Sequence, residues 1–165
     1  MLDQKSELES VELDAAIRAY FTDYYRDQLG LPDWRDHVEA RLDEANTFAK
    51  RVLDWIETWI NFSFAGKRVL VVGGGTGAET FGAHARGANV TTVEPDSNAI
   101  KILAAKARST FRIANPAARA VCESLPYRSD RFDLVICYTV LEHTQDPVQC
   151  IDEMIRVVNP KGWIF

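Results

Sequence analysis

The apolar positions of residues 1–60 follow helical spacing and predict two helices. The first runs from about Ser10 to Leu29 and ends before Gly30 and Pro32, residue types that commonly follow a helix. The second begins after Asp33, which we expect to cap it. Its apolar residues are spaced alternately four and three apart and form one face, which favours packing on a neighbouring domain. That face consists of Val38, Leu42, Ala45, Ala49, Val52, Ile56 and Trp59.

From Phe64 onward the pattern changes to short apolar runs that alternate with helical segments. Such alternation predicts an α/β fold, a Rossmann-like doubly wound parallel sheet with helices on both faces. We therefore expect an N-terminal helical extension over residues 1–60 and an α/β domain over 61–165. The ligand of such a sheet is expected at the carboxyl ends of its strands. The expected strands are 68–72, 90–93, 119–122, 131–137 and one that begins at 162; the expected helices are 78–86, 97–109 (capped by Ser97) and 147–158.

A glycine-rich loop follows the first of these strands. The apolar run Val69–Val72 is broken by Gly73, Gly75 and Gly77, which let the backbone turn sharply and approach a ligand closely. Free N–H groups at the start of the next helix favour a polar or anionic group there. Glu94 closes the second strand twenty-one residues after Gly73, a distance that suits the two hydroxyls of a ribose. A nucleoside cofactor is therefore expected, and the glycines alone fit both a dinucleotide and S-adenosylmethionine (SAM). Alternatively, Glu94 caps the helix that begins near Ser97.

Composition and charge exclude some classes of function. No apolar run is long enough to cross a bilayer. Three cysteines without metal-ligand spacing are typical of reduced, partly buried thiols, so we expect a cytoplasmic protein. Residues 1–60 hold 7 Lys and Arg against 14 Asp and Glu, and residues 61–165 hold 12 against 10, which gives −7 and +2 and the total of −5. This acidic balance argues against a nucleic-acid partner.

Two further features concern the surface. The aromatic residues of the first sixty positions either pack between the helices and the sheet, which we favour, or line a substrate pocket. The chain ends within its fifth strand, and Phe165 leaves an apolar edge. We interpret the sequence as a fragment of a longer domain, and a homo-oligomer could form through that edge or through the N-terminal helices. The aromatic residues are Tyr20, Phe21, Tyr24, Tyr25 and Trp34.

Residues 66–165 resemble the class I SAM-dependent methyltransferases, in particular the small-molecule type 11 group that includes quinone-biosynthesis enzymes. Besides the glycine loop and Glu94, four segments support the resemblance: Glu123–Tyr127 before the fourth strand, Phe132–Val135 within it, Val140–Pro147 after it, and Arg156–Gly162. The resemblance implies SAM as cofactor and a small-molecule methyl acceptor. It covers none of the first sixty residues.

The resemblance also implies roles for individual residues. Gly73, Gly75, Thr76 and Gly77 would lie under the methionine part of SAM, Glu94 would bind both ribose hydroxyls, and Pro95 would contact one face of the adenine. Val121 and Cys122 would hold the adenine edge, and Tyr138 would contact the methionine part. His143 is the one histidine near the expected site and is the candidate general base, although a histidine at a loop more often packs or caps it.

Three positions depart from the family pattern. Val71 and Val121 replace acids that in the family fix the glycine loop and bind the adenine amino group. Thr139 stands where metal-using relatives have a glutamate, so we expect no metal site. The sequence thus predicts a SAM-dependent methyltransferase. The alternatives are a truncated or degenerate module without catalysis and, with less support, a nicotinamide-dependent oxidoreductase.

Overall fold

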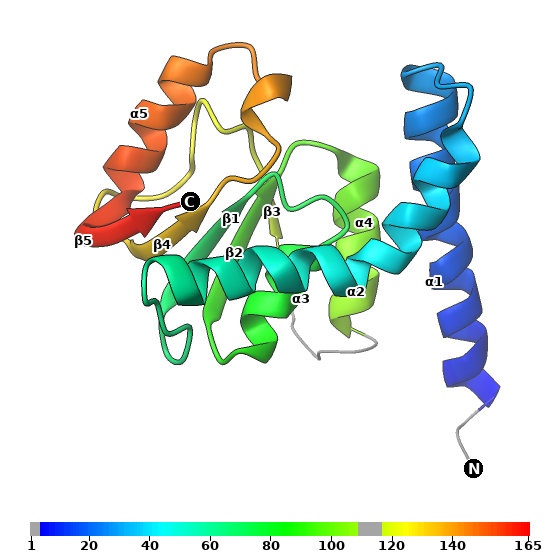
Figure 1. The fold of residues 1–165 in the computed structure, drawn as a ribbon, viewed down its shortest axis with the longest axis horizontal. Coiled ribbons are helices and arrows are strands. Elements are labelled where there is room, and N and C mark those ends of the chain that lie inside the picture. Colours follow the sequence, from blue (N-terminus) through cyan, green and yellow to red (C-terminus); the bar gives the residue numbers. More distant parts are fainter. Residues whose placement is uncertain (1–3, 109–116) are drawn as a thin grey trace.

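The computed structural model describes residues 4–108 and 117–165, with side chains described for 11–42, 50–108 and 117–165. Its centre is a five-stranded sheet with the order β3-β2-β1-β4-β5, in which every neighbouring pair is parallel (Figure 1). This arrangement confirms the predicted doubly wound α/β fold. The strands are β1 (Arg68–Val72), β2 (Asn89–Glu94), β3 (Ala117–Arg119), β4 (Phe132–Ile136) and β5 (Val158–Ile164).

Helices flank the sheet, and an N-terminal pair extends beyond it (Figure 1). None of the helices in the described part of the chain is both long and apolar enough to span a membrane. The N-terminal helices are α1 (Gln4–Thr22), its π-helical continuation η1 (Asp23–Gln28) and α2 (Trp34–Trp59); those after the strands are α3 (Ala78–Ala85), α4 (Ser97–Lys106), the short 3-10 helix η3 (Leu141–His143) and α5 (Pro147–Val157).

The central strand β1 divides the core into two layers, because alternate side chains of a strand point to opposite faces. Val69 and Val71 pack with Val52, Leu53 and Ile56 of α2. Leu70 and Val72, the alternate residues of β1, pack on the other face, against α5. The members of this second layer that come from β1 and α5 are Leu70, Val72, Cys150, Met154 and Val157. The carboxyl-terminal half of α2 is therefore part of the core of the sheet.

Two strands differ from the sequence prediction by more than one residue at an end. The third strand is Ala117–Arg119, not 119–122, because the chain leaves the sheet after Arg119 and Cys122 turns into the core beneath α5. The fifth strand begins at Val158, directly after α5, and not at Gly162. Asn159, Pro160 and Lys161 have loop-like composition, and a register irregularity opposite β4 accommodates them.

The helix ends also differ in detail. Asp96, not Ser97, caps α4, and the predicted end of that helix at Ser109 lies outside the described residues. Asp33 precedes α2, but its carboxylate makes no capping bond and lies 3.3 Å from Nε2 of His37. Trp59 is 68% exposed, although the periodicity placed it on the packed face. It is the last residue of α2 and stacks on Trp55, with 5.2 Å between ring centroids.

The candidate cofactor and substrate cavity

The glycine loop between β1 and α3 has a backbone that requires glycine. Gly77 has φ +95°, and a Cβ there would lie 2.5 Å from Cε2 of Phe81. Gly75 has φ +50°, but a Cβ on it would meet nothing within 4 Å. Gly77 is thus needed for the turn and for packing α3, whereas Gly75 lies against open space. A ligand can approach the Gly75 backbone at that point.

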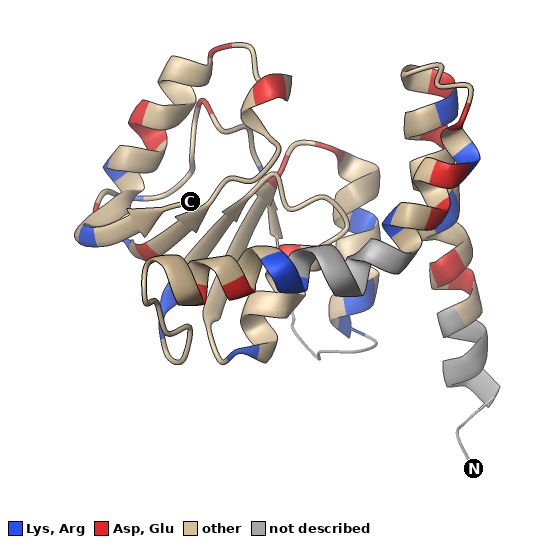
Figure 2. Ribbon diagram, viewed as in Figure 1, with Lys and Arg blue, Asp and Glu red and all other residues tan. Residues whose placement is uncertain are grey.

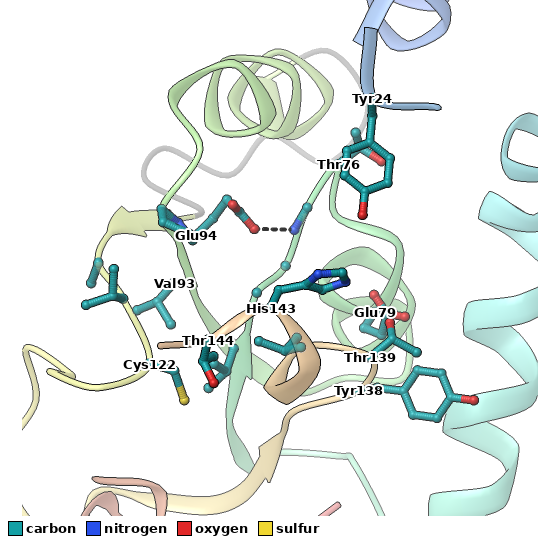
Figure 3. Close-up of a pocket in the computed structure, with 18 of the residues that line it drawn as sticks. Tyr24, Thr76, Glu79, Val93, Glu94, Cys122, Tyr138, Thr139, His143 and Thr144 are labelled. Atoms are coloured by element: carbon teal, nitrogen blue, oxygen red, sulfur yellow. Dashed lines mark hydrogen bonds between the residues drawn. The ribbon is translucent and has the colours of Figure 1, made fainter. Parts of the chain in front are cut away.

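Strand β2 holds this loop in place. The N–H groups of Gly73 and Gly74 donate to the carbonyl of Val93 at 2.9 and 3.2 Å. The Gly75 N–H donates to Oε2 of Glu94 at 2.8 Å (Figure 3). Val71, at the position where the family has an acid, is buried in the core. The carbonyl and carboxylate of β2 therefore anchor the glycine loop from the neighbouring strand.

Glu94 joins two turns with one buried side chain. Its Oε1 accepts the N–H of Asp96 at 2.8 Å, while Oε2 holds the glycine loop. The cap of α4 is the Asp96 carboxylate, which accepts from the N–H groups of Asn98 and Ala99 at 2.7 and 2.8 Å. The interpretation of Glu94 as that cap is therefore wrong. Each Glu94 oxygen retains a second lone pair that can accept a hydrogen bond from a ligand.

A cavity of about 760 Å³ opens at the carboxyl ends of β1, β2 and β4, within the range typical of small-molecule sites. It brings together residues that the sequence placed at one site, although they come from four separate segments. Gly77 is the exception, because it forms the turn behind the loop. The predicted residues that line the cavity are Gly73, Gly75, Thr76, Glu94, Pro95, Val121, Cys122, Tyr138 and His143.

The N-terminal helices form one wall of this cavity. Tyr20, Phe21, Tyr24 and Tyr25 line it, and Figure 3 shows Tyr24 reaching from η1 towards Thr76. Four of the five aromatic residues thus line the cavity, as the alternative interpretation had it, while their rings also pack on one another and Tyr25 stacks on His37 of α2. Trp34, the fifth, is not part of the cavity and lies under the guanidinium groups of its neighbours. Those are Arg26 at 5.5 Å and Arg35 at 4.4 Å from the ring centroid.

The charged residues of the cavity that were not predicted include Arg41 of α2 and Glu79 of α3. Nε of Arg41 donates to the hydroxyl of Tyr25 at 3.0 Å. Burial raises the pKa of Glu79, and the positive charge of Arg41 partly opposes that effect. Glu79 lies two residues after the last loop glycine, and this nearness is the one local signal that pointed to it. Nothing in the sequence around Arg41 does so.

The residues after β4 form the opposite side of the cavity. His143 is exposed on η3, and its backbone N–H donates to the carbonyl of Val140 at 2.9 Å. Tyr138 lines the cavity while its ring packs beside the α2 layer of the core. Val121 is 46% exposed, whereas Cys122 is buried beneath it. The three cysteines are free thiols, and burial raises the pKa of Cys150 to about 12.

Known proteins resemble this chain in sequence and in fold. The methyltransferase domain family matches residues 70–165. A ubiquinone biosynthesis O-methyltransferase from Dechloromonas aromatica (strain RCB) is 34% identical over 113 residues, which are 68% of this chain and 48% of that protein. The chain thus spans about half the length of the curated relatives it matches.

Solved structures with the same fold include a putative S-adenosyl-L-methionine-dependent methyltransferase from Methanococcus maripaludis. It is 15% identical with a TM-score of 0.56, and the match covers 73% of this chain and 63% of that one. The [4+2]-cyclase SpnF is 26% identical with a TM-score of 0.59 over 67% of this chain and 41% of that one. One fold therefore hosts different reactions. The family match over residues 70–165 extends across more than half of the sequence, and the chain belongs to the class I SAM-dependent methyltransferase family.

Proposed function

We propose that this chain binds SAM in the cavity and transfers its methyl group to a small-molecule acceptor. The observation that carries the proposal is the meeting of the open glycine loop and the buried Glu94 carboxylate, 2.8 Å apart, at the carboxyl end of the sheet. A nucleoside with adjacent hydroxyls matches this pair, because the carboxylate accepts hydrogen bonds and the loop admits close approach.

The cavity residues fit the parts of the cofactor. Glu94 binds the ribose hydroxyls through the lone pairs that Gly75 and Asp96 leave unused. Pro95 and the exposed face of Val121, with Cys122 beside it, hold the adenine. Because Val121 has no polar side chain, backbone groups alone would read the adenine amino group. The methionine part lies over the loop, in contact with Gly73, Gly75, Thr76 and Tyr138, and Gly77 keeps that loop in shape.

The acceptor enters between the aromatic residues of η1, Tyr24 and Tyr25, and the 3-10 helix η3. Bound SAM supplies an electrophilic methyl group on a sulfonium. The chain's own residues orient the acceptor and exclude water from it. Holding two reactants in attack geometry can remove about 7–11 kcal/mol of a reaction barrier. Tyr24 and Tyr25 offer ring faces, and His143 at the rim can accept the proton of an acceptor hydroxyl. The name of the Dechloromonas relative, an O-methyltransferase, favours an oxygen acceptor.

Calorimetry with SAM, S-adenosylhomocysteine (SAH) and NAD tests the proposal. We expect SAM and SAH to bind with similar stoichiometry and NAD to give no heat of binding. Binding of NAD alone would overturn the proposal in favour of an oxidoreductase. Binding of SAM without SAH formation, with catechol as a probe acceptor, would favour the alternative of a non-catalytic SAM-binding module.

A further inference from the structure

The wall of the cavity is strongly acidic. Figure 2 shows further acidic positions in the loop after β2 and in η3, on the same edge of the sheet but outside the lining of the cavity. Among the described residues that line the cavity, Arg41 is the sole lysine or arginine. An anionic group of a ligand therefore has one position at which a permanent positive charge can meet it. The acidic lining residues are Glu79, Glu94, Glu123 and Asp146.

Packing holds Arg41 at this wall. It lies on α2, and its Nε donates to the hydroxyl of Tyr25 at 3.0 Å. The Tyr25 ring stacks on His37, one turn before Arg41 on the same helix, with 5.1 Å between centroids. Tyr25 and Arg41 are both half-buried. A guanidinium whose plane is fixed in this way loses little side-chain entropy when it binds a carboxylate.

Glu79 brings the complementary charge. It lies in the first turn of α3, is half-buried, and Figure 3 shows its carboxylate beside Thr139. Both groups line the same cavity although they come from different helices. Burial raises the pKa of this carboxyl group, and the positive charge of Arg41 lowers it by a smaller amount. The cavity is thus lined by a guanidinium group from α2 and a carboxyl group from α3, and Glu79 lies two residues after Gly77 of the glycine loop.

We propose that Arg41 and Glu79 form the subsite for the amino-acid end of SAM, in which Arg41 binds the carboxylate and Glu79 binds the ammonium group. The inference rests on the proposed function. SAM has a single carboxylate, and its ammonium group is bonded to the same carbon, so one cavity that holds both a guanidinium and a carboxyl group can receive the two charges together. Arginine pairs with a carboxylate through two parallel hydrogen bonds. The N-terminal helices, which the family match does not cover, thus complete the cofactor site.

The test compares SAH with 5′-methylthioadenosine, which has the same adenosine and thioether but lacks the amino-acid end. Both dissociation constants are measured by calorimetry on the full chain. We expect Arg41→Gln to weaken SAH binding about tenfold to a hundredfold, since charged hydrogen bonds are lost. Glu79→Gln should weaken it about tenfold. Neither substitution should change the affinity for 5′-methylthioadenosine by more than about twofold.

Two further variants separate charge recognition from folding. Arg35→Gln removes an exposed arginine of α2 that lies outside the cavity, and both affinities should stay as in the wild type. Tyr25→Phe removes the hydroxyl that holds Arg41, and we expect a smaller loss confined to SAH. Equal losses for both ligands in Arg41→Gln, or no loss for either, would overturn the subsite. A wild-type chain that binds neither ligand would instead refute the proposed function, and the subsite with it.

Discussion

Glu94 shows how one side chain can serve both the fold and the cofactor. Its spacing from the glycine loop predicted a ribose ligand, and its role towards the ribose stays a prediction. The structure adds that both oxygens already accept backbone N–H groups, from Gly75 and Asp96. The side chain is 7% exposed. Loss of this carboxylate would therefore leave two half-buried backbone donors without their acceptor as well as removing the ribose contact.

We expect Glu94→Ala to lower both SAM affinity and stability. Affinity should fall about tenfold to a hundredfold, and the free energy of unfolding by about 1–3 kcal/mol, because unsatisfied N–H groups are costly. Glu94→Gln keeps one acceptor oxygen, so its SAM affinity and its stability should lie between those of the wild type and of Glu94→Ala. Calorimetry and urea unfolding measure the two effects. A stable Glu94→Ala protein with unchanged affinity would show that water and the loop backbone replace the carboxylate.

The raised pKa of Glu79 predicts a pH dependence of SAH binding. In the free protein, burial favours the protonated form of the Glu79 carboxyl group. The other charged or titratable groups that line the same cavity include Arg41 of α2, Glu94 of β2 and His143 of η3. A bound ammonium group favours the carboxylate, so binding releases a proton. Affinity should therefore rise with pH through the raised pKa of Glu79 and level off above it. In Glu79→Gln the rise should vanish, and an identical profile in both proteins would contradict this assignment.

Residues of the site differ in how far the sequence reveals them. Gly73, Gly75 and Glu94 belong to a local motif whose spacing along the chain is itself the signal. Arg41 belongs to no motif, because its place in the cavity depends on which face α2 turns to the sheet. That orientation is set by Val52, a core residue three turns later in the helix. Periodicity predicted the buried face but could not place the cavity relative to it.

Single contacts also join the elements of the sheet. Asp133 of β4 accepts the backbone N–H of Arg68 at 2.8 Å and the side-chain amide of Asn159 at 2.7 Å. The Arg68 guanidinium, 2.8 Å from Asp133, holds the pKa of that carboxyl below its usual range. One carboxylate thus ties β1, β4 and β5 together at the end of the sheet opposite the cavity.

Asp133→Asn should lower the free energy of unfolding by about 1 kcal/mol at neutral pH, because hydrogen bonds to a charged acceptor are weakened. The folded-state pKa is lowered, so the charge stabilises the fold above the ordinary aspartate pKa. That contribution is lost as the pH falls below about 4 and through the folded value. Urea unfolding of both proteins at pH 7 and pH 3 should show the difference shrinking at acid pH. If the two proteins differ in their free energy of unfolding by the same amount at both pH values, the loss in Asp133→Asn comes from a change of shape and not from the lost charge.

At the level of elements, the sequence predicted the buried periodic segments closely but placed the third and fifth strands with the wrong limits. The helix α5 and the buried strand β1 follow from pattern alone. Strand β3 is only three residues long, and its limits depend on the pairing of Ala117 to Arg119 with β2. Strand β5 contains Pro160, which local composition assigns to a loop, and only the register with β4 shows it to be paired. Pairing between distant segments has no local signal.

In the molecule as a whole, the position of Arg41 depends on how α2 is seated against α3. Gly82 of α3 faces Leu53 of α2, and a Cβ on Gly82 would lie 2.6 Å from Cδ1 of Leu53. Leu53 is fully buried. Beside this contact, Arg86 pairs with Asp54 at 2.5 Å. The missing side chain of Gly82 thus lets two helices approach closely, and the same α2 presents Arg41 to the cavity.

This close approach predicts a measurable coupling between Gly82 and Leu53. Gly82→Val places a branched side chain where Leu53 lies and should lower the free energy of unfolding by about 1–3 kcal/mol. Leu53→Ala should lower it by about 2–5 kcal/mol, since it leaves a cavity. In the double variant the valine occupies part of that cavity, so the combined loss should be smaller than the sum by about 0.5–3 kcal/mol. Additive losses in urea unfolding would show that the helices separate without repacking. If α2 shifts in Gly82→Val alone, SAH should bind more weakly while 5′-methylthioadenosine binds as before, because the displaced residue is Arg41.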